Sequence, residues 1–162
     1  MAEGSDIHPN VVRVITAAKE AGLDITPRRF PDGTKTAADA AAAIGVSVGQ
    51  IVKSLVFAVD GEVVMAFVSG ANLLDEKKLA TAAGGAVCSR VNADAVRDAT
   101  GFAIGGVPPF GHNTKLRVFI DSDLLQYDEV WAAAGTWNDN FAISPVELMR
   151  VSAGTDTDLK RV

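Results

Sequence analysis

The sequence predicts an α+β fold, in which one domain has a curved, mixed, mainly antiparallel sheet and short flanking helices. Two patterns support this prediction. Short apolar segments alternate along the whole chain with short helical segments that begin at capping residues. Asp60-Gly61, between two apolar segments, is the signal of a two-residue β-hairpin and therefore of antiparallel pairing. Since no linker, repeat or low-complexity tract divides the 162 residues, residues 1–162 are expected to form a single domain.

Proline and glycine mark the boundaries of the first elements. Residues before about Asp6 are expected to fray. Pro9 suits the first turn of a helix that Gly22 ends. Ile25–Phe30 is expected as a short strand, and it should lie at a sheet edge because Pro27 has no N–H donor. The helix is expected to bury one face, made of Val11, Val12, Ile15 and Ala18.

Capping patterns set the next elements. After a turn at Pro31-Asp32-Gly33, an alanine-rich helix is expected over Thr36–Ala43, with its cap at the threonine. Ser47-Val48-Gly49-Gln50 is a second capping box, and it predicts one helical turn that leads directly into a strand. That strand, Ile51–Asp60, is mostly apolar on both faces, which predicts that it is covered on both sides. Glu62–Ser69 is its expected antiparallel partner.

The second half of the chain continues the alternation of short elements. Asp75 and Asn92 are expected N-caps of two helices, and a glycine follows each helix. Ser144-Pro145-Val146-Glu147 predicts a last helix, which a loose polar tail should follow. The elements expected here are helices at 75–83, 92–100 and 144–151, a helical turn at 121–126, and strands at 86–91, 116–120, 128–134 and 140–143.

The composition is that of an ordinary globular protein, with 48% hydrophobic and 22% charged residues. No apolar run is long enough to cross a bilayer, and Met1–Asp6 lacks the basic start and apolar core of a signal peptide. A single cysteine allows no internal disulfide, which fits a reducing cytoplasm. No membrane partner is therefore expected, and Cys88 is expected to be a small core residue rather than a nucleophile.

The net charge of −5 argues against non-specific binding of nucleic acid through a basic surface, so DNA is not expected as a partner. Recognition of one RNA end through a local site stays compatible with this charge. Basic residues do cluster locally, and we interpret these clusters first as solvated surface and only second as RNA contacts. They are Arg28 with Arg29, Lys77 with Lys78, and Lys115 with Arg117.

The first candidate functional feature is the loop Gly-Gly-Val-Pro-Pro-Phe-Gly-His, which holds three glycines and two prolines in eight residues. Glycine lets a backbone approach a ligand closely, and proline restricts its shape. Such a loop suits the binding of a small group by main-chain atoms, although a tight surface turn is the alternative. The residues expected to bind substrate are Gly105, Gly106, Val107, Pro108, Pro109, Phe110, Gly111 and His112.

The second feature is Lys53, a cation within the apolar strand Ile51–Asp60. A buried ammonium group is costly unless it is paired or has a function. One interpretation is a lysine whose stem packs and whose head reaches water. The other is a cation at the mouth of a pocket, facing a substrate oxygen.

Several common enzyme motifs are absent. The sequence has no Walker-type loop, no dinucleotide fingerprint and no zinc-ligand spacing. Its two histidines, His8 and His112, are too few for a histidine-based metal site, so neither a metal nor a cofactor is expected. His112 as the base for a serine such as Ser69 is a minor alternative, because no nucleophile-elbow pattern supports it.

Several motifs that are separate in the sequence occur together and in one order. They are Thr34-Lys35-Thr36, Gly45–Phe57, Val68-Ser69-Gly70, Asp75–Leu79, Thr100–His112, Asp128–Gly135 and Ser144-Pro145. In these motifs the sequence resembles the YbaK / prolyl-tRNA synthetase-associated domain family, the trans-acting aminoacyl-tRNA deacylases. The resemblance runs from about Phe30 to Val151, which is most of the chain.

The resemblance implies an enzyme that hydrolyses the ester joining a mischarged amino acid to the terminal adenosine of tRNA. It also implies a barrel-like mixed sheet with flanking helices. The family's indispensable lysine falls on Lys53, and its Gly-x-x-x-Pro loop falls on Gly105–Pro109, whose backbone should hold the aminoacyl carbonyl region. We expect Lys53 to position the ester, or the terminal ribose and phosphate, electrostatically. With no obvious carboxylate or histidine base, a ribose hydroxyl of the substrate is the hypothetical activator of the attacking water.

Four further residues are weaker candidates for the pocket lining, and each also has a purely structural explanation. They are Phe30, Thr34, Ser69 and Ser144, which equally fit a core aromatic residue, a turn hydroxyl, a strand-end hydroxyl and a helix cap.

The expected partner is the acceptor end of an aminoacyl-tRNA, with a synthetase as a second candidate partner. The foremost candidate substrates are tRNAPro molecules that carry Ala, Cys, Ser or Thr. Two other classes of function stay open. One is a non-catalytic module that binds the acceptor end or a synthetase, and the other is a lysine enzyme that forms a Schiff base with a carbonyl substrate.

Overall fold

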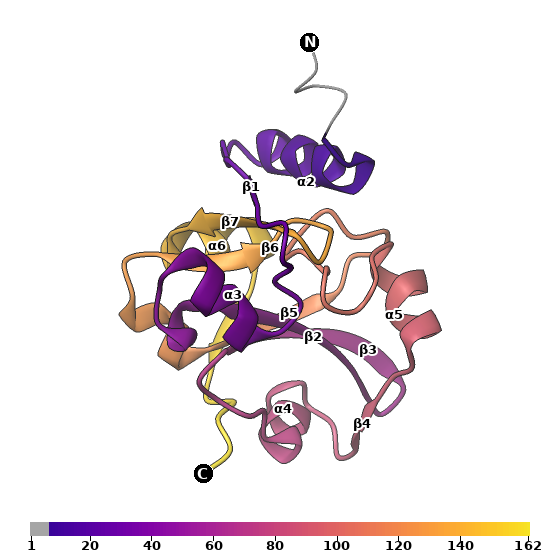
Figure 1. The fold of residues 1–162 in the computed structure, drawn as a ribbon. Coiled ribbons are helices and arrows are strands. Elements are labelled where there is room, and N and C mark those ends of the chain that lie inside the picture. The colour runs from indigo at the N-terminus through magenta and orange to yellow at the C-terminus, as the bar shows by residue number, and fades with distance from the viewer. Residues whose placement is uncertain (1–6) are drawn as a thin grey trace.

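Two open β-sheets share one core, with helices on their outer sides, in the computed structural model, which describes residues 7–162 (Figure 1). The predicted α+β class is confirmed. The helices are α2 (Pro9–Glu20), α3 (Ala37–Ile44), α4 (Glu76–Ala82), α5 (Ala93–Thr100) and α6 (Pro145–Ser152), with 3-10 turns η1 (Val48–Gln50) and η2 (Ser122–Gln126). The strands are β1 (Arg28–Arg29), β2 (Val52–Val59), β3 (Glu62–Ser69), β4 (Cys88–Arg90), β5 (Arg117–Asp121), β6 (Val130–Ala133), β7 (Asp139–Ile143) and β8 (Thr155–Thr157).

The larger sheet has the strand order β4-β2-β3-β5-β8 and is mixed. Its centre is the predicted hairpin, in which β2 and β3 pair antiparallel along their whole length. Asp60 and Gly61 have φ values of 49° and 88°, the left-handed conformation that a two-residue hairpin turn requires. The pairs β3–β5 and β5–β8 are parallel.

The smaller sheet has the order β1-β7-β6 and is antiparallel. An isolated parallel bridge between Ile51 and Trp131 joins it to the larger sheet, but this bridge does not continue into a ladder. The expected mixed sheet is therefore present, but both sheets remain open and do not close into a barrel. The physical reason is that β4 pairs only with Phe57–Val59, which leaves the first part of β2 without a strand on that edge within residues 7–162.

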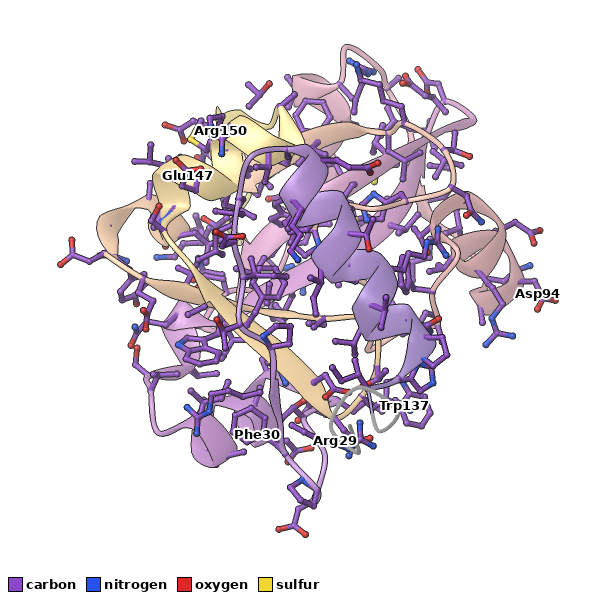
Figure 2. The ribbon with its side chains drawn as sticks, turned by 90° about the horizontal axis from the view of Figure 1, so that it is seen from above. Arg29, Phe30, Asp94, Trp137, Glu147 and Arg150 are labelled. Atoms are coloured by element: carbon purple, nitrogen blue, oxygen red, sulfur yellow. The ribbon has the colours of Figure 1, made fainter. Side chains whose placement is uncertain are left out.

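The larger sheet is covered on both faces, as the apolar character of β2 predicts. Alternate residues of β3 point to opposite sides, so that Met65 and Phe67 belong to the core shared with the smaller sheet, while Val64 and Val68 pack beneath α4. Figure 1 shows α2 outside the smaller sheet and α4 on the opposite side of the molecule, outside the larger one. Figure 2 shows the ion pair between Glu147 and Arg150 along α6.

The α2 helix buries a face that differs from the predicted one. Val11, Val14 and Ala18 are buried, whereas Val12 is 46% exposed. The prediction for Val12 is therefore wrong, because spacings of three and four residues lie on one side of a helix while the neighbour of Val11 is turned by about 100°. The N-terminal segment predicted to fray lies outside the described residues.

Both ends of the sheet system differ from the predicted boundaries. The strand expected over Ile25–Phe30 is reduced to Arg28 and Arg29, although it does lie at a sheet edge, as Pro27 predicts. The expectation of a loose polar tail is wrong, because Thr155–Thr157 forms β8 and Leu159 is fully buried beneath the larger sheet. Cys88 is only partly buried and packs against the same apolar cluster, while burial raises the pKa of its thiol.

Candidate active site

Lys53 lies near the start of β2, where η1 holds the strand in place. Gln50 fixes η1 at two points. Its Oε1 accepts a hydrogen bond from the Ser47 N–H at 3.2 Å, and its Nε2 donates to the carbonyl of Glu129 at 3.1 Å. The start of β2 is thus tied to the chain that enters β6. The position of Lys53 follows from this local capping pattern, which the sequence predicts.

The Lys53 ammonium group is partly buried, and its Nζ donates to the carbonyl of Asn72 at 2.5 Å. Burial lowers the pKa of Lys53, because removal from water disfavours the charged form, and the negative charge of Asp121 acts in the opposite direction. Burial therefore makes the charged ammonium group costly to hold, and Asp121 offsets part of this cost. Perturbed groups of this kind cluster at functional sites.

A buried carboxylate holds Asn72 in place. The Asn72 carboxamide donates to Asp121 Oδ2 at 2.9 Å and to Asp123 Oδ2 at 2.8 Å. Asp121 is 1% exposed, and it also accepts from the Ser69 N–H at 3.0 Å. Neither Asn72 nor Asp121 is predicted as a site residue from the sequence. The available signal is a charged residue, Asp121, directly after the apolar run 118–120, where the sequence predicts only a helical turn.

A cavity of about 310 Å³ opens beside the part of β2 that has no strand on its edge. Its wall comes from α3 and the segment before it, from β2, from the loop after α5, and from β6 and β7. The lining residues are Thr34, Lys35, Thr36, Ala37, Ala40, Ile51, Val52, Lys53, Ser54, Leu55, Ile104, Gly105, Val107, Ala133 and Asn140. Of the predicted site residues, the fold thus brings together Lys53, Thr34, Gly105 and Val107.

Polar groups in the cavity wall form a short hydrogen-bonded chain. Asn140 Nδ2 donates to Thr34 Oγ1, which in turn donates to the carbonyl of Trp137 at 2.9 Å. Both Thr34 and Asn140 are buried. The hydroxyl oxygen of Ser54 is also buried, and it has no hydrogen-bond partner within residues 7–162. This oxygen has almost no accessible surface, so it is an unpaired polar group behind the cavity wall and not a surface that a ligand touches.

Gly105 holds the loop against the rest of the wall. Its φ of 90° is a conformation that favours glycine, and a Cβ placed there would lie 2.9 Å from both Lys35 Cγ and Trp137 Nε1. The next residue, Gly106, packs closely on the backbone of Thr136. The glycines therefore permit close packing between the loop and the β6–β7 turn, and this packing places the Gly105 backbone in the cavity wall.

The second half of the loop faces elsewhere. Pro109, Phe110, Gly111 and His112 line a separate cavity of about 740 Å³, beside β5 and the end of α6. His112 Nε2 donates to the carbonyl of Pro108 at 2.6 Å. Burial lowers the pKa of His112, as does the nearby charge of Arg13, while the bond to Pro108 raises it. The eight-residue loop is therefore divided between two cavities.

Three weaker candidates do not line the Lys53 cavity. The Ser69 hydroxyl donates to the carbonyl of Gly49 at 2.8 Å, and no hydrogen bond joins it to His112. Ser144 accepts from the Glu147 N–H at 3.2 Å and thus caps α6. Phe30 is buried, with the Arg28 guanidinium 5.1 Å from its ring centre. Its ring lies beside the end of β1 (Figure 2).

The family model for the aminoacyl-tRNA editing domain matches residues 31–151 of the sequence. This chain belongs to that family. The predicted resemblance to the editing domains associated with prolyl-tRNA synthetase is therefore confirmed, together with the activity class of an aminoacyl-tRNA deacylase. Among residues 7–162 of the editing domain, no helix combines the length and the apolar character that a membrane span needs.

Relatives of the editing domain include free-standing proteins and parts of larger enzymes. It is 32% identical to YwhH of Bacillus subtilis over 129 residues, which cover 80% of this chain and 81% of that protein. It is 28% identical to the multifunctional Ser/Thr-tRNA deacylase ProXp-y of Escherichia coli K12, over 94% of this chain and 92% of the relative. A proline–tRNA ligase of Maridesulfovibrio salexigens is 30% identical, but the match covers only 21% of that ligase.

The fold of the editing domain also has a close counterpart among solved structures. A crystal structure described as a proposed trans-editing enzyme for prolyl-tRNA synthetase superposes with a TM-score of 0.92. Its sequence is 43% identical, and the superposition covers 97% of this chain and 100% of the other.

Proposed function

We propose that the editing domain acts in trans on mischarged tRNA and hydrolyses the ester that joins a small non-cognate amino acid to the tRNA 3′ end. The foremost candidates are tRNAPro molecules carrying Ala, Cys, Ser or Thr. The observation that carries the proposal is that the partly buried Lys53 lies in the wall of a small cavity, which Gly105 also lines. The proposal takes residues 1–162 as one editing unit, with a synthetase as a candidate partner.

Lys53 is proposed to stabilise the negative charge that develops on the ester oxygen. Water attacks the carbonyl carbon, the bond to the ribose oxygen breaks, and the products are a free amino acid and a tRNA with a free 3′ hydroxyl. A preorganised cation in a poorly solvated site stabilises such charge far better than a cation in bulk water. The bond from Lys53 to the Asn72 carbonyl supports this role, because it fixes the ammonium before substrate arrives.

The attacking water is proposed to be activated by the substrate itself. The lining residues of the cavity include no aspartate, glutamate or histidine that could act as a general base. A vicinal hydroxyl of the terminal ribose is then the nearest group able to orient the water. Full-speed hydrolysis of a tRNA with a terminal 2′-deoxyadenosine, charged through its 3′ hydroxyl, would contradict this step.

The polar groups of the cavity wall are proposed to contact the amino acid. Thr34 and Asn140 add polarity to a mainly apolar wall. Such groups favour a substrate that can form hydrogen bonds with them. The editing domain should therefore prefer Ser or Thr over Ala.

The test is the release of amino acid from tRNAPro charged separately with Ala, Cys, Ser and Thr. We expect the wild-type protein to hydrolyse one or two of these, and Lys53→Ala to lose roughly a hundredfold or more in rate. Lys19→Ala, which removes an exposed lysine in the last turn of α2, is the matched control and should keep wild-type activity. If the wild type binds tRNA but hydrolyses none of the four, the non-catalytic binding module replaces this proposal. A borohydride-trapped adduct on Lys53 would instead indicate Schiff-base chemistry.

A further inference from the structure

An exposed indole stands beside the Lys53 cavity. Trp137, in the turn between β6 and β7, is 46% exposed, whereas the other tryptophan, Trp131, is 8% exposed. The Trp137 ring lies at the periphery of the molecule (Figure 2). A large aromatic ring held at the surface offers a flat face on which another flat group can stack. Its place next to a substrate cavity makes that face relevant to binding.

The Trp137 ring is held rigidly. Its Nε1 donates to the carbonyl of Ile104 at 2.7 Å, and Gly105 packs against the ring edge. Its own carbonyl accepts two bonds from Thr34, from the N–H at 2.6 Å and from the hydroxyl at 2.9 Å. Ile104, Gly105 and Thr34 all line the Lys53 cavity. The orientation of the indole is thus fixed by the same residues that form the cavity wall.

A cation accompanies the ring. Lys35 Nζ lies 3.9 Å from the centre of the Trp137 ring, and Lys35 also lines the cavity. Lys35 makes no salt bridge within residues 7–162; its ammonium lies over one face of the Trp137 ring, and no carboxylate neutralises its charge there. In a chain with a net charge of −5, a cation at the cavity mouth provides local attraction for phosphate.

We infer that Trp137 is the stacking platform for the terminal adenine of the tRNA acceptor end, and that Lys35 binds an adjacent phosphate. The inference rests on the proposed function. In the substrate, the amino acid and the terminal base are attached to one ribose. When the aminoacyl group occupies the Lys53 cavity, the base must therefore lie at its mouth. Proteins recognise unpaired RNA ends by stacking bases on aromatic rings and by contacts with phosphates.

Stacking makes a prediction that differs from a purely structural role of Trp137. Loss of one stacked base weakens binding by roughly fivefold to hundredfold. Phenylalanine keeps a flat ring but cannot donate to the Ile104 carbonyl, whereas alanine removes both. A stacking role therefore ranks the affinities as wild type, then Trp137→Phe, then Trp137→Ala. A role limited to anchoring the loop would make the two variants equally weak.

The experiment measures binding of an uncharged acceptor minihelix with an unpaired 3′ CCA end and of the same minihelix without that end. We expect Trp137→Ala to weaken binding of the first RNA by about tenfold and Trp137→Phe by less than about threefold, with no effect on the second RNA. Val146→Ala, at an exposed apolar residue on α6, is the control and should bind like the wild type. Lys35→Gln should lower the slope of log affinity against log salt by about one.

The outcomes separate this inference from the proposed function. If the wild type deacylates tRNA but Trp137→Ala binds the CCA-ended minihelix normally, the stacking role is wrong and the deacylase stands. Equal losses in Trp137→Phe and Trp137→Ala would likewise reject stacking in favour of loop anchoring. If the wild type neither binds the minihelix nor hydrolyses any aminoacyl-tRNA, both proposals fall together.

Discussion

Asp121 acts on Lys53 in two ways, although the two side chains share no hydrogen bond. Its negative charge raises the pKa of Lys53 against the larger effect of burial. It also accepts from the Asn72 carboxamide, and the carbonyl of the same Asn72 residue receives the Lys53 hydrogen bond. Asp121 is thus a positioning residue, whose removal should change the protonation of Lys53 before it changes the shape of the cavity.

This gives a prediction on pH dependence for Asp121→Asn. Without the carboxylate, the pKa of Lys53 should fall further below its usual value of 10.5, because only burial still acts on it. If Lys53 must be protonated to stabilise the oxyanion, the decline of kcat/KM at high pH should begin at a lower pH in the variant. The measurement is kcat/KM between about pH 6 and 10, after subtraction of uncatalysed ester hydrolysis. Asp158→Asn, at an exposed carboxylate bonded to Lys78, is the control, and identical profiles for both variants would reject the role.

At the scale of elements, the loop from Gly105 is built by close packing rather than by hydrogen bonds alone. Gly105→Ala should lose both stability and activity, since a methyl group would press on Lys35 and Trp137 in a backbone conformation that alanine adopts poorly. We expect a destabilisation of about 1 kcal/mol or more from the backbone alone. The rate of deacylation should fall by roughly tenfold or more, because the cavity wall moves and the substrate is held less well.

Gly45 offers a matched control for this prediction. It ends α3 with a φ of 87°, and a Cβ there would meet nothing within 4 Å. Gly45→Ala should therefore show a similar backbone cost in thermal unfolding but near wild-type deacylation. If both variants keep full activity at a temperature where they are folded, close packing at Gly105 does not support the site.

Local signals in the sequence account for most of the elements. Thr36, Asp75, Asn92 and Ser144 all cap helices as predicted, because a cap needs only the residues within one turn. The Thr155–Thr157 strand was not predicted, because it depends on contacts with distant parts of the chain and not on a local motif. Its sequence has no apolar alternation, and its existence depends on parallel pairing with β5 and on the burial of Leu159.

At the scale of the molecule, contacts between α2 and the chain around α5 link global stability to His112. Arg13 of α2 donates to the Thr100 carbonyl at 3.3 Å and to Asn113 Oδ1 at 2.6 Å. Its guanidinium also lies 4.4 Å from the Phe102 ring centre. Burial lowers the pKa of His112, and the positive charge of Arg13 lowers it further, so that protonation of this histidine is unfavourable in the folded protein.

The stability of the whole molecule should therefore depend on pH through His112. Burial is the main reason why the pKa of His112 in the folded protein lies below its ordinary value of 6.5. At a pH between the folded-state pKa and 6.5, the histidine is therefore protonated in the unfolded chain but neutral in the folded protein. Stability should fall as the pH falls below about 6.5, with a slope of at most about 1.4 kcal/mol per pH unit from this group. Urea unfolding of the wild type and of His112→Gln between pH 5 and 7.5 measures the difference. Parallel pH dependences would show that His112 does not titrate in this way.

The sequence by itself determined the α+β class, the β2–β3 hairpin, the capped helices and the membership in the editing family, since each of these depends on short motifs. It also pointed to Lys53 as a cation in an apolar strand. The tertiary structure alone decided that Gly105 and Lys53 line one cavity while His112 lines another. It alone placed Asn72, Asp121, Asn140 and Trp137 around the site. These residues lie far apart in the chain, and only the packing of two open sheets brings them within hydrogen-bond distance of one another or of the cavity wall.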